Sequence, residues 1–236
     1  MPESPAGPRV AIVDYGMGNL FSVRQACTQA GLNAMITSLP EDVTAADGVI
    51  LPGVGAMPDA MRTLQRLGMS DALIAFAQSG KPLLGVCLGL QLLMSEGTEF
   101  ERHHGLGIVA GSVIRFEHPS RDGRQLKVPH VGWNSVRKVA GAGAPSATGD
   151  SWAGTPFAAL PEGVFMYFVH SFYVVPLEQS VRVAETMYGN TRFCSALARG
   201  SVFGCQFHPE RSGPAGLRVY RGFANLVRLG LPKRES

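Results

Sequence analysis

The chain has 236 residues and a formal net charge of +3, which suits a globular domain of ordinary size without a strongly basic surface. No stripe of basic and aromatic residues indicates nucleic-acid binding, and no apolar run is long enough to span a membrane. Residues 1–8 do not resemble a secretory signal, and the cysteines lack metal-ligand or disulfide-framework spacing. We therefore expect a reduced, cytoplasmic protein with a single domain over residues 1–236.

The first part of the chain alternates short apolar strands with helix-length segments. Strands are expected at residues 10–14, 49–51 and 83–86, and helices at residues 20–30 and 57–76. Gly68 should interrupt the second of these helices. Alternation of this kind favours a doubly wound α/β fold, in which helices cover both faces of a parallel sheet.

Beyond residue 100 the pattern changes to short strands. Strands are expected at residues 108–116, 133–139, 166–175 and 183–188, a hairpin at residues 192–199 and 202–207, and helices at residues 88–94 and 217–229. This pattern predicts antiparallel strands added to a mostly parallel sheet. Residues 140–156 are rich in Gly, Ala, Ser and Pro and predict an exposed loop, and residues 1–8 and 232–236 predict loose ends.

The sequence Gly-Val-Cys-Leu-Gly at residues 85–89 lies between an apolar strand and an apolar helical segment. This Gly-x-Cys-x-Gly pattern matches the nucleophile elbow, a sharp strand-to-helix turn that presents one side chain above the sheet. A helix N-terminus favours the thiolate form of Cys87, which is the reactive form. The alternative is a buried strand cysteine, because free cysteines are usually buried.

A second candidate group, His208-Pro209-Glu210, follows a strand-like run near the C-terminus. His208 and Glu210 project to the same side of an extended segment, and Pro209 keeps that segment from becoming helical. A carboxylate beside an imidazole fixes its tautomer and supports the imidazolium, as the base of a cysteine nucleophile requires. The alternative is an ordinary surface turn. Together with Cys87, the pair would complete a Cys-His-Glu triad.

A glycine-rich turn, Gly53-Val54-Gly55, follows the apolar strand at residues 49–51. In elbow enzymes the oxyanion is held by the amide after the nucleophile, here Leu88, and by an amide from an earlier strand-to-helix loop. Glycines let such a loop approach closely or rotate a peptide, so the Val54 amide is the candidate second donor in the active form of the loop. At rest we expect this amide to point away from the oxyanion site and to turn inward when the partner binds. The alternative is an ordinary strand-to-helix turn.

The stretches GVCLGLQLL, LPGVGA and QFHPE together resemble those of class I glutamine amidotransferases. IVDYGMGNL at residues 12–20, PHVGWN at residues 129–134 and YFVHSFY at residues 167–173 narrow the resemblance to the glutaminase subunits of imidazole glycerol phosphate synthase. The similarity extends from about residue 9 to about residue 230. This resemblance implies a flavodoxin-like α/β architecture.

The resemblance also implies an enzyme that hydrolyses the side-chain amide of glutamine through a thioester on Cys87. His208 would act as acid and base, and Glu210 would orient it. The ammonia would pass to a cyclase subunit of (β/α)8 barrel type in a heterodimer. That subunit would make imidazole glycerol phosphate and an aminoimidazole carboxamide ribonucleotide in histidine biosynthesis. No metal and no cofactor is expected.

The family pattern further implies residues that contact the substrate and the partner. Those expected around glutamine are Gly55, Gln91, Glu99, Ser171 and Phe172, with Glu96 as the alternative to Glu99 for the substrate ammonium. Those resembling partner-face or gate positions are Asn19, Trp133, Tyr167, His170 and Arg211. His170 could instead be a satisfied strand histidine, and Trp133 a core anchor. Arg211 stands where the family usually has lysine, which keeps the charge but changes the hydrogen-bond geometry.

Three other functions share parts of this pattern. A class I amidotransferase serving another product would share the triad, but PHVGWN and IVDYGMGN argue against it. A cysteine peptidase or hydrolase on a similar sheet is opposed by the His-Pro-Glu sequence and by Gln91, one helical turn after Cys87. A non-catalytic binding module of the same fold is opposed by the intact Cys87, His208 and Glu210.

Overall fold

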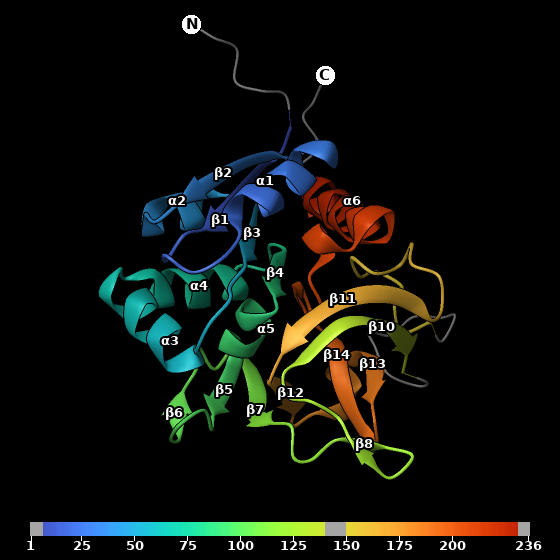
Figure 1. Cartoon of the computed structure of the whole chain (residues 1–236). Helices are drawn as coiled ribbons and strands as arrows, with labels where there is room; N and C mark the ends of the chain where they lie inside the picture. Colours follow the sequence, from blue (N-terminus) through green and yellow to red (C-terminus); the bar gives the residue numbers. More distant parts are fainter. Residues whose placement is uncertain (1–6, 140–149, 231–236) are drawn as a thin grey trace, which may run out of the picture.

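The computed structural model describes residues 7–139 and 150–230. A nine-stranded sheet consists of β1 (Arg9–Val13), β2 (Asn33–Thr37), β3 (Gly48–Leu51), β4 (Leu83–Val86), β10 (His130–Lys138), β11 (Val164–His170), β13 (Arg182–Tyr188), β14 (Thr191–Arg199) and β15 (Val202–Cys205). Their order across the sheet is β11-β10-β13-β14-β15-β4-β3-β1-β2. Figure 1 labels these strands except β15.

Strands β2, β1, β3, β4 and β15 pair in parallel, and β14, β13, β10 and β11 follow through antiparallel pairs. Side chains of β1 alternate between two cores, with Val10 and Ile12 on one face of the sheet and Ala11 and Val13 on the other. A sheet buried on both faces requires such uniformly apolar strands. The expected doubly wound fold with added antiparallel strands is confirmed.

Helices cover both faces of this sheet. One face carries α1 (Leu20–Gln29) and α6 (Gly213–Gly230), and the other carries α2 (Pro40–Ala45), α3 (Met57–Arg66) and α4 (Met69–Gln78) (Figure 1). The segment expected as one interrupted helix over residues 57–76 is two helices. Gly68 separates them with φ = 67°, in the left-handed region that glycine adopts readily.

A second, smaller sheet contains β5 (Met94–Gly97), β6 (His103–His104), β7 (Val109–Arg115) and β12 (Phe172–Pro176), and β12 packs near β14. The segment expected as one strand over residues 166–175 is therefore two strands, and the chain changes sheets at Ser171. The elbow helix α5 (Leu88–Leu92) is shorter than expected, because β5 begins soon after it. The remaining short elements are β8 (Ser120–Arg121), β9 (Arg124–Gln125), and the 3-10 turns η1 (Gln179–Val181) and η2 (Pro209–Arg211).

The prediction of an exposed loop over residues 140–156 is wrong at its C-terminal end. Residues 140–149 lie outside the described residues, but Trp152 is fully buried and Thr155 is nearly so. The small residues and prolines of this segment indicated exposure. The same residue types also suit tight turns around one large buried ring, which is the arrangement found here.

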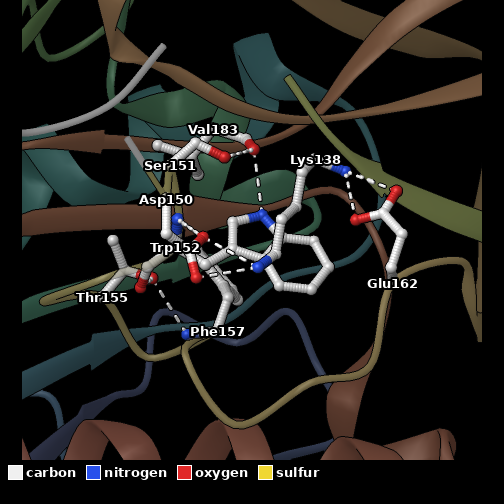
Figure 2. A network of polar contacts seen from close by, with 8 residues as sticks. All are labelled: Lys138, Asp150, Ser151, Trp152, Thr155, Phe157, Glu162 and Val183. Atoms are coloured by element: carbon white, nitrogen blue, oxygen red, sulfur yellow. Dashed lines mark hydrogen bonds and ion pairs between the residues drawn. The ribbon is translucent and has the colours of Figure 1, made fainter. Parts of the chain in front are cut away.

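Polar contacts fix Trp152 in place, as Figure 2 shows. Its indole N–H donates to the Val183 carbonyl at 2.9 Å, and the Ser151 hydroxyl donates to the same carbonyl at 3.1 Å. The Lys138 ammonium pairs with Asp150 at 2.8 Å and lies 5.0 Å from the centre of the Trp152 ring. This segment therefore links β10 and β13 through one buried side chain.

Pro8 is part of the folded structure, contrary to the prediction of a loose end over residues 1–8. Pro8 is buried and its carbonyl accepts from the Asn33 amide at 3.1 Å, so the prediction of a loose end fails at Pro8. Gly7 is exposed, and the rest of that prediction, residues 1–6 and 232–236, lies outside the described residues. Among the helices of the described residues, none has the length and apolar character needed to cross a membrane.

The two tryptophans of the chain offer a matched test of this packing. Trp152→Ala should lower the free energy of unfolding by about 3–5 kcal/mol, because it empties an enclosed site and removes a buried hydrogen bond. Trp133→Ala should lower it by less than about 1 kcal/mol, because Trp133 is 55% exposed. Urea unfolding followed by circular dichroism measures both losses. Equal losses would show that Trp152 is not an anchor.

Candidate active site

Strand β4 and helix α5 meet at Cys87, where the backbone turns sharply. Cys87 has φ = 54°, which is unusual for a residue with a side chain, and it is the N-cap of α5. Its amide donates to the Cys205 carbonyl at 2.8 Å, which ties the turn to the neighbouring strand β15. The backbone therefore has the strand-to-helix turn predicted for a nucleophile elbow.

Two glycines permit this turn, because a side chain at either position would collide with the backbone. A Cβ atom on Gly89 would lie 1.7 Å from the Leu51 carbonyl oxygen, and one on Gly85 would lie 2.8 Å from the Gly89 carbonyl oxygen. Helix α5 thus rests directly on the ends of β3 and β4. The elbow glycines are required for close approach of the backbone, since neither has a positive φ.

His208 and Glu210 form a buried pair just beyond β15. His208 Nδ1–H donates to Glu210 Oε1 at 2.7 Å, and His208 Nε2 is buried without a hydrogen-bond partner among the described residues. Burial lowers the pKa of His208, but the Cys87 sulfur and the Glu210 carboxylate outweigh this effect and raise the pKa to about 10. The imidazole is therefore well suited to take the proton of the Cys87 thiol.

Strand β11 and helix α6 hold this pair in place. The His208 amide donates to the Tyr167 carbonyl at 2.9 Å, and the Ser212 hydroxyl donates to the His208 carbonyl at 2.7 Å. The Tyr220 hydroxyl of α6 donates to Glu210 Oε2 at 3.5 Å. The added antiparallel strands thereby fix His208 relative to an elbow that belongs to the parallel strands.

The glycine-rich loop after β3 touches the elbow. The Leu88 amide, an expected oxyanion donor, instead donates to the Gly53 carbonyl at 3.4 Å. In a trans peptide the carbonyl and the following N–H point in opposite directions, so the Val54 N–H points away from Leu88. Leu88 and Val54 therefore do not converge as an oxyanion hole in this conformation, as expected of the loop at rest.

A cavity of about 420 Å³ lies at the elbow and is bordered by Cys87. All the residues expected around glutamine line it, namely Gly55, Gln91, Glu99, Ser171 and Phe172. Val54, Leu88, His170 and Arg211 line it as well. His208 is outside the cavity wall, buried beside Cys87. The structure thus gathers residues from distant parts of the sequence around one thiol.

Gln91 links the Phe172 backbone at the cavity wall to the Cys87 thiol through Gln206. Its side-chain amide donates to the Phe172 carbonyl at 3.0 Å and to Gln206 Oε1 at 3.2 Å. The Gln206 amide in turn donates to Cys87 Sγ at 3.6 Å. Sequence reasoning did not assign a role to Gln206. Its position in an apolar strand end, close before His208, was the available signal of a buried polar group.

The structure distinguishes the two glutamates considered for the substrate ammonium. Glu99 lines the cavity and accepts from the Met57 amide at the start of α3 at 2.8 Å. Glu96 pairs with Arg102 at 2.6 Å and is not part of the cavity wall. Glu99 is therefore the better placed of the two, and one of its oxygens also stabilises the N-terminus of a helix.

His170 does not lie on an exposed partner face, because it is only 5% exposed. Its Nδ1 donates to the Phe172 carbonyl at 2.8 Å, and its Nε2 lies 3.1 Å from His130 Nδ1. Burial lowers the pKa of His170 to about 3 and that of His130 to about 4. His170 thus has the satisfied ring nitrogens of the alternative considered for it, and it also lines the cavity. His130 is a buried partner that sequence reasoning missed.

An aromatic–guanidinium cluster, formed by Trp133, Tyr167 and Arg211, reaches the cavity through Arg211. The Trp133 and Tyr167 rings meet edge to face at 6.2 Å, and the Arg211 guanidinium lies 4.9 Å from the Tyr167 ring centre. Trp133 is largely exposed and is not the core anchor considered as its alternative. Asn19 is also exposed, and its side chain accepts from the Ser22 amide as the N-cap of α1.

Comparison with known proteins assigns the chain to a family. The family model described as glutamine amidotransferase class I matches residues 11–225, and the chain belongs to this family. It is also similar to proteins named imidazole glycerol phosphate synthase subunit HisH. The one from Moorella thermoacetica is 45% identical, covering 93% of this chain and 95% of that protein. Those from Syntrophotalea carbinolica and Legionella pneumophila (strain Lens, HisH 1) are 43% and 39% identical, covering 92% of this chain and 100% and 99% of theirs.

Solved structures with low sequence identity share the fold. A structure described as glutamine amidotransferase superposes with a TM-score of 0.67 at 18% identity, covering 93% of this chain and 98% of that chain. The structure of PurLQS from Thermotoga maritima gives a TM-score of 0.67 at 19% identity with coverage of 93% and 98%. These likenesses show the class I glutamine amidotransferase fold.

The buried histidine–carboxylate pair predicts how two variants differ in glutamine hydrolysis. His208→Ala should lower the rate about 10²–10⁴-fold, because it removes the group that takes and returns the proton. Glu210→Gln should cost less, because it keeps an acceptor for His208 Nδ1–H and loses only the charge. Tyr220→Phe keeps the carboxylate and removes only the long hydrogen bond to Glu210 Oε2, so it should cost less than Glu210→Gln. Glutamate release measures all three; a fully active His208→Ala protein would show that His-Pro-Glu is only a turn.

Proposed function

We propose that this chain is the glutaminase subunit of an imidazole glycerol phosphate synthase. The observation that carries the proposal is a single cavity in which Cys87 faces Gln91 and the Ser171–Phe172 backbone, beside the buried pair of His208 and Glu210. Support for this particular synthase comes from the similarity to HisH subunits over 92–93% of the chain. The PHVGWN and IVDYGMGN stretches favour the same synthase over other amidotransferases.

Cys87 is the nucleophile of the proposed reaction. His208 takes the thiol proton, and the sulfur attacks the side-chain carbonyl carbon of glutamine. The C–N bond then breaks while the imidazolium gives a proton to the leaving ammonia. Water next attacks the glutamyl thioester with His208 as base, which releases glutamate and restores the thiol. Glu210 keeps the proton on Nδ1, so that Nε2 serves the reacting atoms.

Glutamine binds in the cavity with its side-chain amide at Cys87. The Glu99 carboxylate pairs with the substrate ammonium, and backbone groups of Ser171 and Phe172 bind the substrate carboxylate. Gly55 and Gln91 border the aliphatic part of the substrate and its amide. The volume of about 420 Å³ is in the range of small-molecule sites, which supports an amino acid as the ligand.

In the absence of the partner, the conformation of the Gly53-Val54-Gly55 loop keeps the rate of glutamine hydrolysis low. With the Gly53 carbonyl bonded to the Leu88 amide and the Val54 N–H turned away, a tetrahedral intermediate lacks its donors. Rotation of the Gly53–Val54 peptide frees the Leu88 amide and turns the Val54 N–H inward. Glycine offers little resistance to such a rotation. Each missing donor costs about 10²–10³ in rate.

The partner is a cyclase subunit of (β/α)8 barrel type, which forms a heterodimer with this chain. The surface that binds the cyclase includes the aromatic–guanidinium cluster of Trp133, Tyr167 and Arg211, together with Asn19. Tryptophan and arginine are frequent hot spots of interfaces, and Arg211 borders the cavity in which ammonia is released. The cyclase uses the channelled ammonia to make imidazole glycerol phosphate and an aminoimidazole carboxamide ribonucleotide in histidine biosynthesis.

The test compares glutamine hydrolysis by the chain alone with hydrolysis by its complex with the cyclase and the cyclase's ribonucleotide acceptor. The loaded complex should be at least about 10²-fold faster, because it regains an oxyanion donor. Val54→Pro removes that donor and should abolish most of the activation while leaving the slow basal rate. Val54→Ala keeps the N–H and should retain most of the activation.

Two results would count against the proposal, and each contradicts a different part of it. Equal rates for the chain alone and the loaded complex would contradict the loop rotation but not the glutaminase. Absence of glutamine-dependent synthesis in the loaded complex would overturn the proposed function. The Cys87→Ala control should lose synthesis from glutamine and keep synthesis from added ammonium salts, because the cyclase performs that chemistry.

A further inference from the structure

A chain of side-chain hydrogen bonds, with the buried His130–His170 pair at its centre, runs from β10 to the cavity wall. Asn134 Nδ2 lies 3.3 Å from His130 Nε2, and His130 Nδ1 lies 3.1 Å from His170 Nε2. His170 Nδ1 lies 2.8 Å from the carbonyl oxygen of Phe172, which lines the cavity. His130 and His170 are opposite each other in the antiparallel β10–β11 pair, so the sheet register itself places the two rings together.

The cavity end of this chain fixes the direction of its hydrogen bonds. A carbonyl oxygen only accepts, so His170 Nδ1 carries the proton that bonds to Phe172. In a neutral ring the other nitrogen, His170 Nε2, is then an acceptor. It therefore receives the hydrogen bond from His130 Nδ1–H, which leaves His130 Nε2 as an acceptor in turn.

The other end fixes the same direction independently. Asn134 Oδ1 accepts from the Ser135 amide at 2.8 Å, and its Nδ2 donates to the Met187 carbonyl at 2.8 Å. Backbone groups thus orient the Asn134 amide so that its nitrogen, a donor, faces His130 Nε2. One arrangement of tautomers satisfies every group in the chain. A proton added to either ring would set two N–H donors against each other.

The surroundings favour this neutral arrangement. His130 and His170 are 3% and 5% exposed. Four aromatic rings, those of Phe116, Phe168, Tyr188 and Phe193, surround the pair, and the Tyr188 ring stacks on His130 at 4.1 Å. In an apolar enclosure a satisfied hydrogen bond is strong, and an unpaired polar group is costly. This chain of hydrogen bonds therefore holds the Phe172 carbonyl, at its cavity end, firmly in place.

That carbonyl connects the pair to the reacting atoms. It accepts from His170 Nδ1 and from the Gln91 amide at 3.0 Å. Gln91 also bonds to Gln206, whose amide contacts Cys87 Sγ. A rotation of the Phe172 peptide would therefore disturb both the substrate-binding backbone and the neighbours of the thiol.

We propose that His130 and His170 are positioning residues for glutamine, and that their hydrogen bonds hold the Ser171–Phe172 backbone in the conformation that binds the substrate. Both nitrogens of His170 are used within the protein, so it acts through Phe172 and makes no hydrogen bond to the substrate. This inference rests on the proposed glutaminase function. It predicts an effect on the KM for glutamine that exceeds the effect on kcat.

Two polar variants of one residue separate positioning from space filling. The amide nitrogen of His170→Asn can replace Nδ1 and keep the bond to the Phe172 carbonyl. The amide of His170→Gln extends further and replaces Nε2, so it keeps contact with His130 and loses the bond to Phe172. Phe116→Leu is the packing control, because the Phe116 ring lies 5.2 Å from His170 and makes no side-chain hydrogen bond with it.

The experiment measures KM and kcat for glutamine in the complete synthase, together with the thermal unfolding midpoint. His170→Gln should raise KM about tenfold, the scale of one lost hydrogen bond, with a smaller change in kcat. His170→Asn should keep KM within about threefold of the parent. Phe116→Leu should lower the unfolding midpoint without raising KM.

The result that overturns the inference is an unchanged KM in His170→Gln, or equal increases of KM in His170→Gln, His170→Asn and Phe116→Leu. In the second case the pair would only fill space. A parent synthase that does not hydrolyse glutamine would instead overturn the proposed function, and this inference with it. The kinetics of the parent therefore distinguish the two failures.

Discussion

The active site depends on the close approach of helix α5 to the ends of β3 and β4. Gly89 lies against the Leu51 carbonyl with no space for a Cβ atom, and this contact sets the sharp turn at Cys87. The same approach brings the Leu88 amide within reach of the Gly53 carbonyl. The position of the thiol and the state of the oxyanion loop are therefore consequences of one packing contact.

The antiparallel strands supply the parts of the candidate site that the parallel strands lack. Because β15 pairs directly with β4, the residues that follow β15 bring His208 beside Cys87. Strand β11 holds the His208 backbone, and the chain leaves β11 at Ser171 to enter the second sheet. That change of sheet places the Ser171–Phe172 backbone over α5, where Gln91 binds it. Cys87, His208 and the expected substrate groups thus come from separate elements that meet at one edge.

Much of this site was predictable from sequence, because the elbow, the His-Pro-Glu turn and the glycine-rich loop each have a local pattern that constrains the backbone. The parallel half of the sheet was predictable for the same reason. Features that arise only when strands distant in the sequence pack together could not be predicted. Trp152 is buried because Val183 accepts its N–H, and His130 is paired because β10 lies beside β11. The break at Ser171 was missed because the apolar pattern continues across it from one sheet into the other.

The reactivity of Cys87 is the claim on which the rest stands, and covalent labelling tests it most directly. The chain would be treated with a chloroketone analogue of glutamine, and each cysteine-containing peptide would be weighed by mass spectrometry. All four cysteines are buried, but only Cys87 borders the cavity. Burial raises the pKa of the Cys27, Cys194 and Cys205 thiols, so these three should stay unmodified. Cys87 alone should gain one equivalent of label, and glutamine should protect it. An unlabelled Cys87, or equal labelling of all four thiols, would contradict its role as the nucleophile.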